Sequence, residues 1–298
     1  MKKQVLALAV AALATSGAFA QANDTLAKIK GSGAIALGVR DSSALSYTLG
    51  NGKYVGFHTE MGERIIEDLG KTAGKKLTVN YVPVTSQNRI PLVQNGTVDL
   101  ECGSTTNNAT RQKDVDFATT TYVEVVRIAV KAGSGIKELK DLNGKTVATT
   151  TGTTSVQTLR KNERAQGIDF KEVMGKDHAD SFLLLETGRA DAFVMDGSIL
   201  AANISKSKAP KDYAIVGPEL SVEPIACMVR KGDEAFLKAV NESIARQIKD
   251  GSLNKLYDKW FMQPVPPTNT ALNLPLSDAT KAAWANPNNK PMEDYAKK

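Results

Sequence analysis

Arginine and hydroxyl side chains gather in short segments that each follow an apolar, strand-like run of the sequence. Three segments share this position: Gly38–Ser43, Thr85–Arg89 and Glu101–Arg111. Their candidate binding residues are Arg40, Ser86, Arg89, Ser104, Thr106 and Arg111. Arginine grips a carboxylate with two parallel hydrogen bonds, and hydroxyls and free backbone N–H groups can complete an anion site. The segments together predict recognition of a carboxylate, although Arg40 taken alone reads as an ordinary surface residue and Asn108 in the third segment reads as a helix cap.

Three later segments occupy similar positions. Thr149–Ser155 contains Thr154 and leads into a helix start, but it lacks the GxxxxGK[ST] pattern of a nucleotide-binding loop. His178 lies in a segment where Asp180 or Ser181 is expected to cap a helix, and a lone histidine there is more often structural. Asp196 ends an apolar run, where its carboxylate can receive an ammonium group.

Alternating strands and helices must position these segments. The first unit is predicted to contain strands Ala34–Val39, Leu77–Val84 and Val98–Cys102, separated by helices Phe57–Leu69 and Asn88–Gln94. Apolar residues four apart along Phe57–Leu69 make one helical face. This order predicts a mostly parallel sheet covered by helices.

The pattern then restarts. Further strands are predicted at Val125–Val130, Thr146–Thr149, Phe170–Val173, Ala192–Met195, Ala214–Val216 and Ile225–Val229. Helices are predicted at Ser155–Ala165, Ser181–Gly188, after Gly197, around Phe236–Ile244 and at Leu253–Phe261. The polar tail to Lys298, rich in Asn and Pro, is expected to pack loosely. Two such units predict two α/β lobes, with the loops at strand ends facing a cleft between them.

The first residues predict secretion. Lys2 and Lys3 precede an unbroken apolar run from Val5 to Ala14, and small residues follow at Ala18 and Ala20. This is the pattern of a cleaved signal peptide over residues 1–20. The apolar run is too short for a membrane anchor, and the absence of a nearby cysteine argues against a lipoprotein.

Composition excludes several classes of function. The net charge is +6, but 38 basic and 32 acidic residues are interspersed, so no nucleic-acid partner is expected. Two histidines, without a CxxC or HExxH motif, argue against a metal site, and no cofactor is expected. Cys102 and Cys227 can either form a disulfide in an oxidising compartment or remain buried strand thiols.

In order and spacing, the segments resemble the amino-acid-binding proteins of bacterial ABC importers, solute-binding protein family 3, and most closely those that bind glutamate and aspartate. The resemblance covers nearly the whole chain after residue 20. Its most specific stretches are Thr85–Thr97, Glu101–Asn108, Gly152–Ser155, Lys176–Phe182 and Ala226–Lys231.

The resemblance implies a two-lobed α/β periplasmic binding protein fold of type II, with two crossover strands and a ligand cleft. Lobe one would comprise residues 21–127 plus 223–298, and lobe two residues 128–222, with crossovers near Val125–Arg127 and Leu220–Pro224. The protein would be a periplasmic monomer that closes on L-glutamate or L-aspartate. It would deliver this ligand to an ABC permease and its ATPase in the inner membrane.

The resemblance also implies residue roles. Arg111, assisted by Thr106 and the helix start at Thr154, would clamp the α-carboxylate. Asp196 would receive the α-ammonium, with Ser104 beside it. The side-chain carboxylate would meet the remaining candidates, which are Arg40, Ser86, Arg89 and His178. No catalytic residue is expected.

The charge count points the same way, because three arginines against one aspartate suit a ligand with two carboxylates and one ammonium. A neutral ligand would leave a buried arginine unpaired, and a basic ligand would be repelled. Two rival functions stay open: a dehydratase-like enzyme on the same fold, and a stand-alone amino-acid sensor domain. The choice between glutamate and aspartate also stays open.

Overall fold

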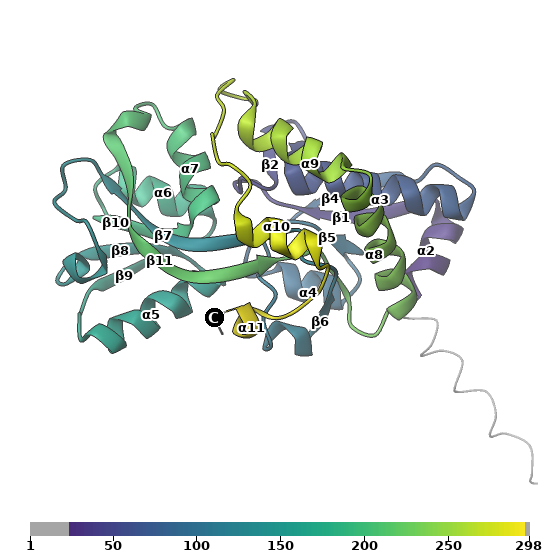
Figure 1. The fold of residues 1–298 in the computed structure, drawn as a ribbon, viewed down its shortest axis with the longest axis horizontal. Coiled ribbons are helices and arrows are strands. Elements are labelled where there is room, and N and C mark those ends of the chain that lie inside the picture. Colours follow the sequence, from purple (N-terminus) through teal and green to yellow (C-terminus); the bar gives the residue numbers. More distant parts are fainter. Residues whose placement is uncertain (1–23, 296–298) are drawn as a thin grey trace, which may run out of the picture.

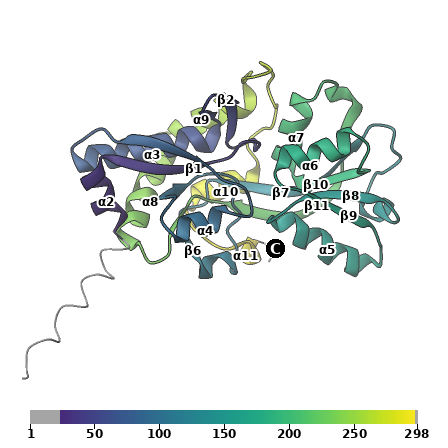
Figure 2. The same ribbon diagram turned by 180° about the vertical axis from the view of Figure 1, so that it is seen from behind.

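The computed structural model describes residues 24–295, in which two sheets with covering helices form two lobes (Figures 1 and 2). The expected signal peptide, residues 1–20, lies outside the described residues. No helix within residues 24–295 is long and apolar enough to cross a membrane.

The first lobe contains a five-stranded sheet in the order β4-β1-β5-β12-β6. Its strands are β1 (Ala34–Val39), β4 (Thr78–Pro83), β5 (Leu100–Glu101), β6 (Val115–Phe117) and β12 (Met228–Arg230). β1 pairs in parallel with β4 and β5, whereas β12 is antiparallel to β5 and β6. The predicted parallel arrangement therefore holds for the part of the sheet that carries Arg40.

The helices of the first lobe bury apolar faces. They are α2 (Thr25–Ser32), α3 (Phe57–Ala73), α4 (Arg89–Gln94), α8 (Glu234–Lys249) and α9 (Ser252–Tyr257). α3 buries Phe57, Met61, Ile65 and Leu69, the stripe expected from their spacing. It ends at Gly74, which has a left-handed backbone conformation with φ of 70° that glycine adopts without strain.

The second lobe contains a five-stranded sheet in the order β11-β7-β10-β8-β9. Its strands are β7 (Tyr122–Lys131), β8 (Thr146–Thr150), β9 (Lys171–Gly175), β10 (Ala192–Asp196) and β11 (Tyr213–Ile225). Its helices are α5 (Thr154–Gln166), α6 (His178–Glu186) and α7 (Gly197–Lys206). β8, β9 and β10 are parallel, but β7 is antiparallel to both of its neighbours, so the sheet is mixed.

Two long strands connect the lobes (Figure 1). β7 and β11 pair from Tyr122 opposite Ile225 to Lys131 opposite Tyr213, with an irregularity between Val216 and Ser221. The sequence predicted shorter strands here, because glutamates and two prolines interrupt the apolar runs. The predicted lobe boundaries at 127/128 and 222/223 fall inside these two strands and stay a prediction.

A hairpin was missed by the sequence analysis. It pairs β2 (Tyr47–Gly50) with β3 (Lys53–Val55). The turn between them contains Asn51 and Gly52, both with positive φ, and an Asn-Gly pair is a strong hairpin signal. Short 3₁₀ helices cover Arg111–Lys113, Leu139–Leu142 and Pro210–Asp212, and a π-helical turn covers Asp258–Met262.

The expectation of a loosely packed tail was wrong. Two helices, α10 (Asp278–Ala285) and α11 (Met292–Tyr295), lie along the connecting strands, where Figure 1 shows the tail in yellow. Trp284 is buried, and its Nε1 donates to the Thr121 carbonyl oxygen at 2.9 Å. The Thr280 hydroxyl accepts from the Val123 N–H at 3.0 Å. One buried tryptophan and these bonds hold a segment whose overall composition is polar.

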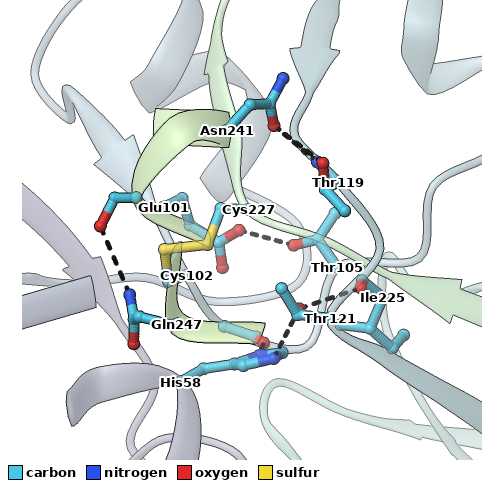
Figure 3. The surroundings of a disulfide bond; sticks show 12 residues. His58, Glu101, Cys102, Thr105, Thr119, Thr121, Ile225, Cys227, Asn241 and Gln247 are labelled. Carbon is cyan, nitrogen blue, oxygen red and sulfur yellow. Dashed lines mark hydrogen bonds between the residues drawn. A yellow bond between two sulfur atoms is a disulfide. The ribbon is translucent and has the colours of Figure 1, made fainter. Parts of the chain in front are cut away.

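Cys102 and Cys227 form a disulfide, which settles the alternative left open by the sequence (Figure 3). Cys102 directly follows β5, and Cys227 lies between β11 and β12. The bond therefore ties the segment that leads into Ser104 and Thr106 to the end of a connecting strand.

Loss of this disulfide should lower stability substantially. The cysteines are 125 residues apart, so the cross-link restricts a large loop in the unfolded chain. The Cys102→Ala/Cys227→Ala variant should lose about 2–5 kcal/mol of unfolding free energy in guanidinium titrations. Dithiothreitol should lower the wild-type midpoint and leave the variant unchanged. Equal midpoints for oxidised and reduced wild type would contradict the assignment.

Candidate functional site

All nine residues proposed from the sequence are buried, and their contacts form a polar layer between the lobes. The first lobe and its loops supply Arg40, Ser86, Arg89, Ser104, Thr106 and Arg111, and the second lobe supplies Thr154, His178 and Asp196. The loops that follow parallel strands meet in this layer, as expected for α/β lobes.

Arg40 is the most extensively bonded of the three arginines. It follows β1 and is 0% exposed. Its Nη1 donates to the Ser104 hydroxyl at 3.4 Å, and its Nη2 donates to the Ser86 hydroxyl at 3.1 Å. The same Nη2 lies 3.0 Å from Nε2 of His178 in the other lobe. One carboxylate, that of Asp177, approaches Arg40, at 3.9 Å.

His178 is a neutral side chain in this layer. Burial, followed by the charge of Arg40, lowers its pKa to about 3. Its Nδ1 lies 3.1 Å from the Thr150 hydroxyl. A neutral ring that accepts from Arg40 at Nε2 must carry its proton on Nδ1. The helix start differs from expectation: Asp177, rather than Asp180 or Ser181, caps α6 through the N–H of His178.

Arg89 lacks any ion pair within the described residues. It is 2% exposed, its Nη1 donates to the Ser104 carbonyl oxygen at 3.0 Å, and its Nε has no hydrogen-bond partner there. Burial lowers the pKa of Arg89 well below its ordinary value, and the charges of Arg111 and Arg40 add to this effect. A guanidinium held this way suits an anion that comes from outside the chain.

Arg111 reaches across to the second lobe. Its Nη1 donates to the Thr106 carbonyl oxygen at 2.8 Å, and its Nη2 donates to the Gly152 carbonyl oxygen at 3.2 Å. Burial lowers the pKa of Arg111. Carbonyl oxygens are neutral acceptors, so they orient the guanidinium without neutralising its charge.

Asp196 offers the opposite charge. It ends β10 and is 2% exposed, and its Oδ1 has no hydrogen-bond partner in the described part of the chain. Burial raises the pKa of this carboxyl well above its ordinary value, and the charges of Glu124 and Glu223 raise it further. An ammonium group placed beside this unpartnered oxygen would oppose these effects and stabilise the charged carboxylate.

Sequence reasoning missed three buried carboxyl groups beside the site: Glu101, Glu124 and Glu223. Each lies in or at the end of an apolar strand, and that placement was the available signal. The Glu101 carboxylate accepts from the Thr105 hydroxyl at 2.8 Å (Figure 3). Burial raises the pKa of Glu124 to about 7. The charge count of three arginines against one aspartate therefore needs revision, because these buried acids lie near the same arginines.

Glu223 joins the two lobes. Its Oε2 accepts from the hydroxyls of Thr106 and Thr154, each at 2.5 Å, and these hydroxyls lie 3.2 Å apart. Since Thr106 belongs to the first lobe and Thr154 begins α5 in the second, the contact exists only when the lobes are close.

The lobe backbones also touch at Gly152, which has φ of +81°. A Cβ atom added there would lie 2.8 Å from the Cα and N atoms of Gln87 in the first lobe. Real Cβ atoms do not approach backbone so closely, so only glycine permits this arrangement of the lobes.

Metal-binding side chains do not gather in the described chain. Within residues 24–295, no group of three or more His, Cys, Asp or Glu residues is arranged to hold an ion.

Known proteins share both the sequence and the two-lobed architecture. Residues 35–263 match the family described as bacterial extracellular solute-binding proteins, family 3. The L-glutamate/L-aspartate-binding protein of Pseudomonas aeruginosa is 45% identical over 272 residues, which is 90% of each chain. The glutamate/aspartate import solute-binding protein of Escherichia coli is 43% identical over 295 residues, covering 96% of this chain and 98% of that one.

A solved structure gives a similar result. The ancestral amino acid-binding protein AncCDT-1, a precursor of cyclohexadienyl dehydratase, has a TM-score of 0.68 and 30% identity, covering 80% of this chain and 99% of that one. The predicted two-lobed α/β fold is therefore confirmed, and so is the resemblance noted in the sequence. The chain belongs to the bacterial extracellular solute-binding proteins of family 3.

Proposed function

We propose that this protein is the periplasmic solute-binding component of an ABC importer and that it binds L-glutamate or L-aspartate between its lobes. The observation that carries the proposal is the burial of Arg40, Arg89 and Arg111 without a close ion pair, next to the unpartnered oxygen of Asp196. The names of the Pseudomonas and Escherichia relatives support the same ligand class.

The charges of such a ligand complement this layer. A second carboxylate would meet Arg40 and Arg89, beside Ser86 and the neutral His178. The α-carboxylate would meet Arg111 at the start of α5, where first-turn N–H groups lack intrahelical partners. The α-ammonium would meet Asp196. The three arginines and Asp196 would then each face an opposite charge, which offsets the cost of removing these groups from water.

Binding would be accompanied by hinge closure about β7 and β11. An open form would separate Thr154 from Thr106 and Gly152 from Gln87, giving the ligand access. A ligand that contacts both lobes stabilises the closed form by its differential affinity for the two forms. The closed, loaded monomer would then deliver the ligand to an inner-membrane permease and its ATPase. Export to the periplasm would use the signal peptide expected at residues 1–20.

An enzymatic role has less support from the site. A dehydratase needs a general acid or base poised at the substrate. In the described structure both ring nitrogens of His178 have partners, Arg40 and Thr150, and burial keeps the ring neutral. We therefore propose a binding protein rather than an enzyme. Transfer to a permease, as opposed to a stand-alone sensor role, rests on the relatives' names.

Calorimetry on refolded, ligand-free protein should detect binding of glutamate, aspartate or both. Glutamine should bind at least about 100-fold more weakly than the better acidic ligand, because it leaves a buried guanidinium without its charged partner. Arginine should show no binding. Tighter binding of glutamine or arginine than of both acidic amino acids would refute the proposal.

Substitution of two arginines should distinguish recognition of the α-carboxylate from recognition of the side-chain carboxylate. Arg111→Met should abolish measurable binding of every amino acid. Arg89→Met should lower the affinity for acidic amino acids at least tenfold more than the affinity for glutamine. The control is Arg160→Met, because Arg160 pairs with Glu172 on the outside of the second lobe. Equal losses for glutamate and glutamine in Arg89→Met would contradict the role of Arg89.

Gly152→Ala tests closure itself. The added methyl group would collide with Gln87, so affinity for glutamate and aspartate should fall by the same factor, at least tenfold. Gly144→Ala is the matched control, because Gly144 has a φ of +72° but open space around its Cβ position. Small-angle X-ray scattering with saturating ligand should show a larger radius of gyration for Gly152→Ala than for the wild type, and no increase for Gly144→Ala. Unchanged affinity would argue against closure at this contact.

A further inference from the structure

Glu223 is buried beside the site, but the roles expected for the nine site residues assign it no function. It is 0% exposed and lies on β11, opposite Glu124 on β7. Its Oε1 accepts from the Ser221 hydroxyl at 2.9 Å, and its Oε2 accepts from Thr106 and Thr154. Three hydroxyl donors thus converge on one buried carboxylate.

The direction of these bonds has a chemical consequence. A threonine hydroxyl carries one proton and two lone pairs. Each hydroxyl lies 2.5 Å from the Glu223 carboxylate but 3.2 Å from the other hydroxyl, so both direct that proton to Glu223 and neither has a proton left for another partner. Toward any other group, each hydroxyl presents lone pairs and can only accept. A ligand group that contacts them must therefore donate, as an ammonium does and a carboxylate does not.

Neighbouring groups fit the same conclusion. Glu223 is close enough to Asp196 for its charge to raise the pKa of that carboxyl, and Asp196 has an oxygen without a donor. Arg111 and the first turn of α5 remain available to a carboxylate, because the capping residue Thr153 makes no side-chain hydrogen bond to that turn.

We propose that Glu223 is a specificity-determining residue that fixes Thr106 and Thr154 as hydrogen-bond acceptors, so that the site selects a ligand with an α-ammonium group. This inference rests on the proposed function. It also changes the expectation that the Thr106 hydroxyl assists Arg111 at the α-carboxylate, since this hydroxyl has no proton to give. Glu223 acts through the two hydroxyls and positions them.

The test compares glutamate with (S)-2-hydroxyglutarate, in which a hydroxyl replaces the ammonium. A ligand hydroxyl can donate or accept, so it tolerates either orientation of the threonines. In Glu223→Gln, the amide can donate to the threonines and release their protons. Calorimetry should show that glutamate loses at least tenfold more affinity than the hydroxy acid.

Glu124→Gln separates hydroxyl orientation from simple loss of charge. Glu124 lies opposite Glu223, and its charge acts more strongly on Asp196 than that of Glu223. Its carboxylate, however, accepts from Ser198 and Val125 and makes no hydrogen bond to either threonine in the described structure. Glu124→Gln should reduce the preference for glutamate over (S)-2-hydroxyglutarate by less than threefold. Equal narrowing in both variants would overturn the inference in favour of charge alone.

Thr154→Val and Thr154→Ser provide a second test that leaves Glu223 intact, in case Glu223→Gln does not fold by circular dichroism. The valine variant loses one acceptor, so its affinity for glutamate should fall more than its affinity for the hydroxy acid. The serine variant should retain the wild-type preference for glutamate over the hydroxy acid. An equal or larger penalty on the hydroxy acid would overturn the inference. Failure of wild-type protein to bind glutamate at all would instead refute the proposed function.

Discussion

Three guanidinium groups are withdrawn from water where the lobes meet, and much of the surrounding structure limits the cost of that burial. Arg89 and Arg111 donate to backbone carbonyl oxygens, those of Ser104, Thr106 and Gly152. These bonds fix the guanidinium planes but do not neutralise their charge. Buried acids nearby moderate the field without forming close ion pairs. Such a layer stays charged and ordered while it retains the capacity to hold an anion.

The connecting strands do more than join the lobes. β7 and β11 carry Glu124 and Glu223 opposite each other, so the elements about which the lobes would rotate also contribute charge to the layer. The disulfide and the C-terminal tail both reach these strands from the first lobe. The binding segment around Thr106 is bonded to β11 by a backbone bridge to Ile225. Movement of the strands and rearrangement of the site are therefore mechanically linked.

Local patterns in the sequence predicted most strands and helices because those elements bury regular apolar faces. Ala34–Val39 matches β1 in full, as an uninterrupted apolar run should. The long β11 was underestimated because Glu223 and its neighbours read as a break, although tertiary contacts satisfy the carboxylate. The nine site residues were found through their positions after strands and through family resemblance. The buried glutamates were missed because local pattern does not reveal which charges a fold will bring together.

The two tryptophans of the chain lie next to residues at the connections between the lobes. Trp284 donates to the Thr121 carbonyl oxygen beside β7, and Trp260 packs edge-on against Tyr47. The ring of Tyr47 in turn lies under the ammonium of Lys206, a residue of the second lobe, at 4.0 Å. Indole emission depends on such neighbours. Separation of the lobes would remove Lys206 from Tyr47 and change the surroundings of Trp260, so closure could be followed by intrinsic fluorescence without attaching a dye.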